Sequence, residues 1–291
     1  MPTIRILHPN DEPTLEAFLQ PRLASSMILL SNLRQVGLLD HGEPYQGTYA
    51  ATFEGDAITG VAAHYWNQNI ILQAPPDQVA PLCQAASSAA KRPIGGFIGP
   101  AGQVRAAKQA FCTDIPIQMD SVEILYSLDL NDLQEPEGLH TGQVTGRPAA
   151  EHDLEMLTQW RVSYCREALG AEETPELYPS TREEIARSID EGSLWVLEEN
   201  GQVVASSGFN SRIAEAVQVG GVWTPPNLRR RGYGRAAVAV SLLDARAEGA
   251  EQAILFTGEE NIAAQKAYLA LGFQPIGDYA IVLLKQPINL A

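Results

Sequence analysis

The chain has 291 residues, 45% of them hydrophobic, which is enough for two modest domains with buried cores and argues against global disorder. Its formal net charge of −15 argues against nonspecific binding to DNA or RNA, whose phosphates would be repelled. Cys83, Cys112 and Cys165 lie far apart, as is typical of free thiols in a reducing cytoplasm. The N-terminal sequence lacks a signal-peptide pattern, and no apolar stretch reaches the roughly 20 residues that a membrane span needs. We therefore expect a cytoplasmic protein that binds neither nucleic acid nor a membrane.

The first half alternates between strand and helix patterns. Leu23, Met27, Leu30 and Leu33 recur at spacings of three and four, which predicts a helix with a core-facing stripe. The predicted elements are a strand at 3–7, helices at 11–19 and 23–36, strands at 48–53, 57–65 and 69–73, a helix at 76–90, a strand at 93–98, a helix at 101–111, and one or two strands over 119–130.

A polar segment separates the two halves. Residues 131–142 are rich in Asp, Asn, Gln, Glu, Pro and Gly and show little periodicity, which indicates a linker. We therefore expect a first domain at 1–133, a linker at 134–141 and a second domain at 142–291.

The second half repeats the order of elements. Thr181, followed three residues later by Glu184, predicts a capping box at the start of a helix. The predicted elements are a strand at 143–147, helices at 150–169 and 181–191, strands at 193–198, 202–209 and 216–223, a helix at 232–248, a strand at 252–256, a helix at 261–271, and a closing strand at 276–284.

Two pairs of similar segments support an internal duplication. Residues 54–58 resemble 200–204, and residues 106–111 resemble 263–268, in the same order in each half. Together they suggest a repeat of about 140 residues, the size of one domain.

The most informative stretch runs from Gln218 to Arg235. An apolar strand pattern ends in a double proline, and an arginine run, Gly232-Tyr-Gly234 and a helical pattern follow. Glycine lets the backbone turn freely and approach a ligand, and the start of a helix favours an anion. The sequence therefore predicts a phosphate or pyrophosphate cradle, with positive charge from Arg229, Arg230, Arg231 and Arg235. The corresponding residues 73–77 of the first half contain no glycine, so we expect that half to lack the phosphate site.

The loop Arg229-x-x-Gly232-x-Gly234 resembles the signature loop of the GNAT superfamily of acyl-CoA N-acyltransferases. Residues 221–226 look like the end of that family's fourth strand, and Asn261, Tyr268 and Leu271-Gly-Phe273 resemble the motif after its fifth. The motifs cover the second half, and the first half resembles the family in element order alone. The resemblance implies an α/β (α+β) protein of two tandem GNAT-type domains. Each is a mixed, mostly antiparallel sheet flanked by helices, and the first is a degenerate copy.

The resemblance also implies an activity, N-acetylation by direct attack of an amine on acetyl-CoA, with no metal. The backbone N–H groups of Val222, Trp223 and Thr224 would bind the pantetheine arm and polarise the thioester carbonyl. Tyr268 would protonate the departing thiolate, and Asn261 would bind the pantetheine arm. The implied pyrophosphate loop consists of Arg229, Arg230, Arg231, Gly232, Tyr233, Gly234 and Arg235.

Each of these residues also has a structural interpretation. Tyr268 lies on an apolar helical stripe, Trp223 could be a packing residue, and Asn261 could be a helix N-cap. The sequence does not identify a general base for the incoming amine. The nearby carboxylates are each expected to lie on the surface, and the two histidines of this half lie away from the motifs. These carboxylates are Glu215, Glu259, Glu260 and Asp278, and the histidines are His140 and His152.

Two other functions remain as alternatives. The first is an NAD-binding oxidoreductase, because Gly232 to Ala237 also fit GxGxxA, the dinucleotide-binding fingerprint, although Pro225–Arg231 separate it from its strand and too few residues follow for the usual sheet. A protein that binds or senses CoA without turnover is the second alternative. The sequence leaves open whether the acceptor is a small-molecule amine or a peptide or protein amine, and whether the protein is a monomer or a homodimer.

Overall fold

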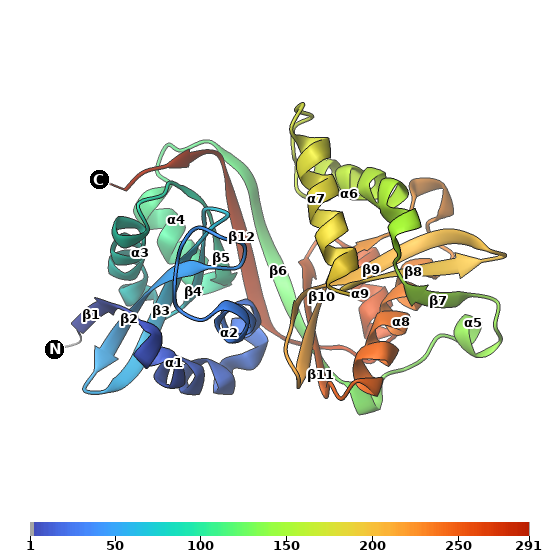
Figure 1. The fold of residues 1–291 in the computed structure, drawn as a ribbon, viewed down its shortest axis with the longest axis horizontal. Coiled ribbons are helices and arrows are strands. Elements are labelled where there is room, and N and C mark those ends of the chain that lie inside the picture. The colour runs from blue at the N-terminus through green and yellow to red at the C-terminus, as the bar shows by residue number, and fades with distance from the viewer. Residues whose placement is uncertain (1–2, 291) are drawn as a thin grey trace. The chain divides into compact units, whose positions relative to one another are not determined.

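A computed structural model describes residues 3–290, which divide into two compact units (Figure 1). The first unit comprises the described parts of Met1–Leu125 and Gly277–Ala291, and the second is Tyr126–Ile276. The units therefore divide at other positions than the predicted domains, because the last strand of the chain belongs to the first unit. Periodicity predicts that a segment is a strand, but not which sheet it joins. No helix within residues 3–290 is long and apolar enough to cross a membrane.

The first unit is built on a mixed sheet. Strands β1 to β4 pair antiparallel in chain order, β5 joins β4 in parallel, and β12 lies antiparallel to β5. Its elements are β1 (Thr3–Ile6), α1 (Glu12–Leu19), α2 (Leu23–Val36), β2 (Gly47–Glu54), β3 (Ala57–Tyr65), β4 (Asn69–Gln73), α3 (Pro76–Ala90), β5 (Ile94–Pro100), α4 (Ala101–Phe111), the start of β6 (Ile117–Asp129) and most of β12 (Gln274–Ile288).

Helices cover both faces of this sheet, because neighbouring residues of a strand point to opposite sides. Ala50 of β2 packs in a core with residues of α3 and α4, such as Leu82 and Val104. The adjacent Tyr49 donates its hydroxyl hydrogen bond to the Leu29 carbonyl of α2, at 3.3 Å.

The second unit repeats the arrangement. Strands β7 to β10 pair antiparallel in chain order, and β11 joins β10 in parallel. Its elements are the end of β6, α5 (Glu137–His140), β7 (Thr145–Pro148), α6 (Leu154–Ala168), α7 (Leu177–Asp190), β8 (Leu194–Glu199), β9 (Gln202–Arg212), β10 (Ala216–Trp223), α8 (Tyr233–Ala247), β11 (Gln252–Gly258), α9 (Ile262–Leu269) and the start of β12. The same order of elements and strand pairs in both units supports the predicted duplication.

Different helices cover the two faces of the second sheet. Trp195 of β8 donates its indole N–H to Asp244 of α8, at 2.6 Å. Its neighbours Leu194 and Val196 pack on the other face in a core with Leu157 of α6 and Ile185 of α7. The site described below lies on this second face and at the end of β10.

Most predicted elements are confirmed, but two helix starts are four residues from their predicted positions, and α6 begins at Leu154 after a 3-10 turn at Glu151–Asp153. α2, α3, α4, β3, β4 and β10 have the predicted bounds. However, α7 begins at Leu177, so Thr181 is a buried residue within the helix and caps nothing. The predicted linker contains the short helix α5.

The core of the first unit should depend on the last strand of the chain. Leu284 of β12 is 5% exposed in this core, whereas Ile276, at the start of β12, is 49% exposed. Leu284→Ala should lower the free energy of unfolding by about 2–5 kcal/mol because it leaves a cavity. Ile276→Ala should change it by less than about 0.5 kcal/mol. Urea denaturation followed by circular dichroism measures both, and equally small effects would contradict the placement of β12.

Candidate functional site

A β-bulge interrupts the end of β10. Gly220 pairs with Gly208 of β9 and Trp223 pairs with Ser206, so Gly221 and Val222 together oppose one residue. Gly221 has a φ of +61°, a conformation that glycine adopts more easily than other residues. The extra residue of a bulge leaves the ladder, and its backbone groups become available to another partner.

The other edge of β10 also opens at this level. β10 and β11 pair in parallel at Ala216, Val217 and Gln218, but β10 continues to Trp223 and β11 to Gly258. Beyond Gln218 the two strands have no further register pairs within the described residues. The end of β10 therefore presents strand edge that an extended ligand can pair with.

A short loop connects this strand end to α8. Gly232 is the N-cap of α8 with a φ of +81°, and no side chain caps the helix. A methyl group added at Gly232 would meet nothing within 4 Å, and one at Gly234 would lie 3.4 Å from Thr224 Oγ1. The start of α8, a helix of 15 residues, is therefore open to an anion, which its N–H groups and dipole attract.

Arg229 is engaged by the protein itself. Its Nη1 and Nη2 donate to the two carboxylate oxygens of Glu167 on α6, at 2.7 and 2.8 Å, and its Nε donates to the Thr224 carbonyl at 3.1 Å. The guanidinium also lies 4.9 Å from the ring centroid of Trp223. The hydrogen bonds from Arg229 hold the pKa of the Glu167 carboxyl below its usual value. Arg229 thus ties the loop to α6 and to the end of β10.

The other loop side chains differ in their surroundings. Tyr233 is buried and donates its hydroxyl to Glu199 of β8 at 2.6 Å, which raises the pKa of the phenol. Arg230 and Arg231 are exposed, and Arg230 has a φ of +65°. Arg235, in the first turn of α8, has a buried Nε without a hydrogen-bond partner among the described residues. Of the four arginines, Arg235 therefore has an unsatisfied donor beside the helix start.

Tyr268 lies on α9, and Asn261 is the residue just before this helix. Asn261 is exposed and caps the helix, since its side-chain oxygen accepts the Ala264 N–H at 3.2 Å. Tyr268 is 9% exposed, and its ring centroid lies 6.5 Å from that of Tyr126 and 5.9 Å from that of Phe273. The Tyr268 ring therefore takes part in the core, as its position on an apolar stripe predicted.

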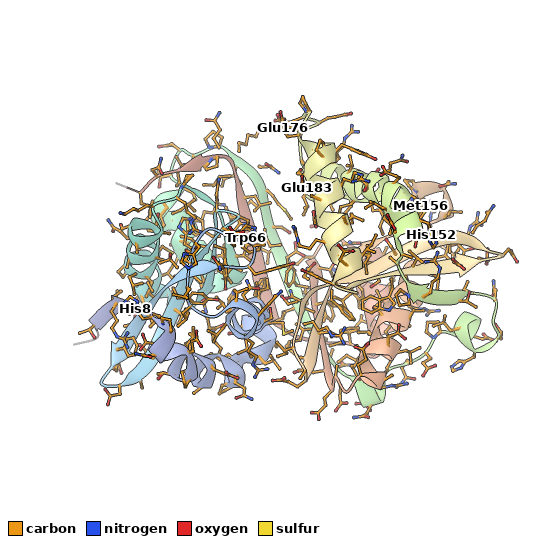
Figure 2. The ribbon with its side chains drawn as sticks, in the orientation of Figure 1. His8, Trp66, His152, Met156, Glu176 and Glu183 are labelled. Atoms are coloured by element: carbon orange, nitrogen blue, oxygen red, sulfur yellow. The ribbon has the colours of Figure 1, made fainter. Side chains whose placement is uncertain are left out.

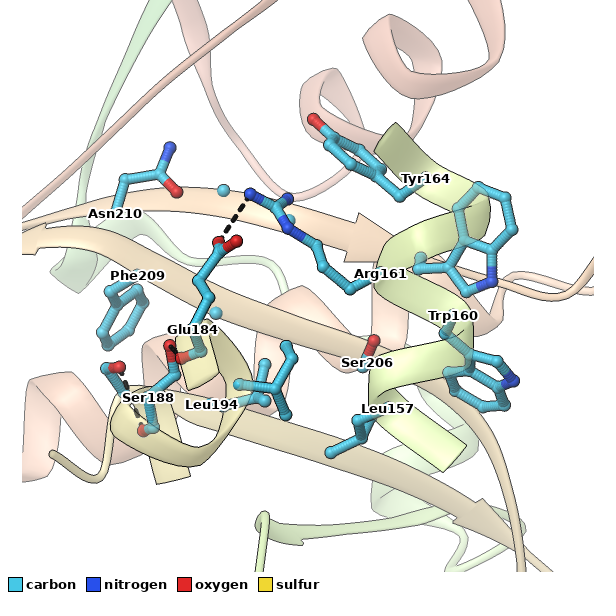
Figure 3. A pocket seen from close by; sticks show the side chains of 16 residues that line it. Leu157, Trp160, Arg161, Tyr164, Glu184, Ser188, Leu194, Ser206, Phe209 and Asn210 are labelled. Carbon is cyan, nitrogen blue, oxygen red and sulfur yellow. Dashed lines mark hydrogen bonds and ion pairs between the residues drawn. The ribbon is translucent and has the colours of Figure 1, made fainter. Parts of the chain in front are cut away.

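A cavity of about 60 Å³ lies between α6, α7 and the strands β9 and β10 (Figure 3). Gly220, Gly221 and Trp223 of the bulged strand form part of its wall. Leu157, Trp160, Arg161 and Tyr164 reach it from α6, Glu184, Ile185 and Ser188 from α7, and Ser206, Phe209 and Asn210 from β9.

A charged pair lies within this cavity. Arg161 Nη2 donates to Glu184 Oε1 at 2.7 Å, and the guanidinium lies 4.8 Å from the ring centroid of Tyr164. Burial disfavours the charge of Arg161, but the facing Glu184 outweighs this effect, so the pKa of the guanidinium is raised. The Nε of Arg161 is buried without a hydrogen-bond partner among the described residues. Figure 3 shows the two side chains pointing toward each other from α6 and α7.

A sequence model of the acetyltransferase (GNAT) family matches residues 154–273. This part of the chain belongs to the GNAT family. The match covers the bulged strand, the glycine loop and the motif around Tyr268 but not the first unit.

Solved structures extend the likeness of fold to the whole chain. A Drosophila protein is 13% identical, with a TM-score of 0.69 over 97% of this chain and 98% of its own. A tandem GNAT protein from the clavulanic acid biosynthesis pathway is 12% identical, with a TM-score of 0.55 over 97% and 98%. A GCN5-related N-acetyltransferase from Kribbella flavida is 18% identical, with a TM-score of 0.58 over 91% and 95%. No curated protein matches the sequence significantly. Over its whole length the chain thus has the fold of a tandem GNAT-type protein.

Sequence reasoning missed the charged pair of the GNAT domain. Arg161 lies at helical spacing from Leu157 and Tyr164 within the predicted helix at 150–169. An arginine within an apolar stripe was the available signal, since such a side chain needs a buried partner. Glu184 had been interpreted as half of a capping box, which hid its role as that partner.

The four carboxylates considered as a general base do not line the cavity between α6, α7, β9 and β10. Glu215 precedes β10, Glu259 and Glu260 follow β11, and Asp278 lies on β12. Among the described residues that line the cavity, Glu184 is the one carboxylate.

The two histidines of this half also lie elsewhere. His152, labelled in Figure 2, precedes α6. Its Nε2 lies 3.5 Å from Asp153 Oδ1. His140 ends α5, with its Nε2 3.8 Å from Glu135 Oε2.

Proposed function

We propose that the GNAT domain transfers the acetyl group of acetyl-CoA to a primary amine, by direct attack of the amine on the thioester in a ternary complex. One observation carries the proposal: β10 has a bulge on its β9 edge and no register pairs with β11 beyond Gln218 among the described residues, just before the loop that leads into the uncapped, glycine-started helix α8. This combination offers strand edge for an extended arm and helix N–H groups for a diphosphate.

The cofactor contacts would come mainly from the backbone. The N–H groups of Val222, Trp223 and Thr224 would bind the pantetheine arm and polarise the thioester carbonyl, as an oxyanion hole does. The N–H groups from Gly232 to Arg235 would bind the pyrophosphate, with the unpartnered Nε of Arg235 beside them. Holding the amine against the thioester removes much of the entropic barrier.

The side chains of the loop would then have two kinds of role. Arg230, Arg231 and Arg235 would supply positive charge to the pyrophosphate. Arg229 would not bind the pyrophosphate directly, because its guanidinium is already bound to Glu167. The Arg229–Glu167 pair would instead hold the loop in place. Asn261 would keep its cap of α9 and bind the pantetheine arm with its remaining donor.

The first domain would have no CoA site of this kind. Its helix α3 follows β4 after two residues and has Pro76 and Asp77 in its first turn. Proline supplies no N–H group, and the aspartate places negative charge where a phosphate would bind. We therefore assign the cofactor to the second domain and regard the first as a degenerate copy.

Tyr268 raises the alternative of a domain that binds CoA without turnover. The tyrosine would protonate the leaving thiolate in the active enzyme. Its 9% exposure and its two aromatic neighbours equally suit a residue of the core. A protein in which Tyr268 is only a packing residue could bind the cofactor and lack the acid.

The first experiment is a calorimetric titration of the full chain with acetyl-CoA, with NADH as the control ligand. We expect micromolar binding of acetyl-CoA and no response to NADH. Gly232→Asp should weaken acetyl-CoA binding at least about tenfold, because it adds a negative charge at the start of α8. Gly249→Asp is the matched control, since Gly249 follows the other end of α8 with a φ of +100° and open space around it. Equal affinity of the two variants, or absence of acetyl-CoA binding to the unaltered chain, would refute the site.

A second comparison separates positioning of the loop from direct binding by Arg229. If the Arg229–Glu167 pair positions the loop, Arg229→Met and Glu167→Gln should each weaken CoA binding by a similar factor, about three- to tenfold, and the double variant should add little. If Arg229 binds phosphate directly, Glu167→Gln should instead preserve or improve affinity, because the guanidinium is released. Calorimetry with CoA measures all three variants.

A third comparison tests the acid. Tyr268→Phe removes only a hydroxyl, so it should lower kcat at least about tenfold and leave the affinity for CoA nearly unchanged. Tyr126→Phe is the control, because it removes the hydroxyl of the ring beside Tyr268. Release of free thiol in the presence of an amine panel reports the rate. Normal turnover of Tyr268→Phe would assign the residue to the core alone.

A further inference from the structure

We propose that Arg161 binds a carboxylate of the acceptor, so that the acceptor is an amine of the amino-acid class. This inference rests on the proposed function, because it concerns the second substrate of the same reaction. The feature that carries it is a guanidinium that lines a cavity beside the bulged end of β10 and whose buried Nε has no hydrogen-bond partner among the described residues.

The position of the cavity suits the acceptor rather than the cofactor. The proposed cofactor contacts follow the chain backwards, from the pyrophosphate at residues 232–235 to the pantetheine arm at 222–224. The cavity wall continues this path, since it includes Trp223, Gly221 and Gly220. A group in the cavity would therefore lie beyond the pantetheine arm, where the thioester and the attacking amine have to meet.

The guanidinium has donors that the protein leaves unused. Arg161 carries five N–H donors, and its hydrogen bond to Glu184 uses one of them. The Nε has no partner among the described residues, and Nη1 would lie 3.7 Å from a methyl group added at Gly221. A buried unsatisfied donor is costly, and a guanidinium matches a carboxylate in geometry. A carboxylate in the cavity would bind the terminal nitrogens of Arg161, of which Nη1 lies on the side of Gly221.

The charge balance favours an amine that itself carries the carboxylate. Arg161 and Glu184 together are neutral, so a lone carboxylate would add an uncompensated negative charge to a partly buried site. An amino acid brings an ammonium group with its carboxylate and keeps the sum at zero. Glu184, whose side chain is 41% exposed against 21% for Arg161, is accessible to that ammonium group.

The cavity also has a suitable size and lining. A volume of about 60 Å³ has room for roughly four or five water-sized groups, enough for a carboxylate and the carbon beside it. Tyr164 stacks on the guanidinium, and Ser206 and Asn210 supply further polar groups from β9. Trp160 and Phe209 give the remaining wall an apolar character that excludes a large polar substrate.

The competing explanation is that Arg161 and Glu184 only tie α6 to α7. The chain contains a control for this role, because Arg182 of α7 pairs with Glu155 of α6 at 2.8 Å on the exposed side of the same two helices. A purely structural Arg161 would affect all acceptors equally, as loss of the Arg182 pair would.

The test uses the full chain, acetyl-CoA and matched pairs of amino acids and their carboxamides, with thiol release as the readout. For the best pair, we expect kcat/KM to be about 10- to 100-fold higher for the acid than for the amide. Arg161→Met should reduce that ratio to about one, mainly through KM of the acid, while the rate with the amide changes little. Arg182→Met should leave the ratio unchanged. If the unaltered protein prefers no acid over its amide, or if Arg161→Met keeps the preference, the inference is wrong.

A binding measurement covers the case in which Arg161→Met folds poorly or turnover is absent. With CoA bound, which supports no turnover, the unaltered chain should bind free amino acids more tightly than their carboxamides, and Arg161→Lys should lose most of this preference. Absence of acetyl-CoA binding would overturn the proposed function itself. Binding of CoA without discrimination between acids and amides would overturn this inference alone.

A last comparison tests whether the carboxylate that Arg161 binds belongs to the acceptor or to the acyl group of the donor. Succinyl-CoA and acetyl-CoA are compared with a neutral amine as acceptor. We expect no preference for succinyl-CoA. A preference that disappears in Arg161→Met would place the carboxylate on the acyl chain and refute its assignment to the acceptor.

Discussion

The candidate site depends on one irregular stretch of backbone, the end of β10, which has a bulge toward β9 and separates from β11. A regular strand would satisfy its N–H and C=O groups within the sheet and leave nothing for a ligand. In the second domain, a bulge at Gly221 and Val222 breaks the ladder with β9, and the parallel pairing with β11 ends at Gln218. Because the bulge lies at the level where the pairing with β11 has ended, the strand end can offer backbone groups to a ligand while the rest of β10 stays paired.

The surrounding side chains hold this irregular backbone in place. Arg229 binds Glu167 and the Thr224 carbonyl and lies near the face of Trp223, while Tyr233 binds Glu199. Two residues that look like ligands in the sequence therefore act first as anchors. An anion at the start of α8 would meet mostly backbone N–H groups, whose direction is fixed by the helix and costs no side-chain entropy.

The sequence predicted what depends on local patterns. Hydrophobic periodicity located nearly every strand and helix, and Gly232 located the start of α8, because both signals act over a few neighbouring residues. Pairings over long distances could not be predicted in this way. The Thr181–Glu184 pattern fits a capping box, yet α7 starts at Leu177, and Glu184 faces Arg161 on another helix instead. The cavity and its charged pair exist only once α6 and α7 pack on the sheet.

The same limit applies to the last strand, and it changes how the degenerate domain should be understood. β12 pairs with β5 and places Ala280, Val282 and Leu284 in the core of the first unit. The end of β6 lies beside β11, where Gln252 donates to Ser127 at 2.7 Å and Leu130 N–H donates to the Glu251 carbonyl at 2.8 Å. Each unit therefore draws a strand from the other half of the sequence. A cut in the segment between the halves would remove β12 from the first core and the end of β6 from the second. The first half of the sequence is therefore needed by the second unit whether or not the first unit binds a ligand, because the end of β6 belongs to the second unit.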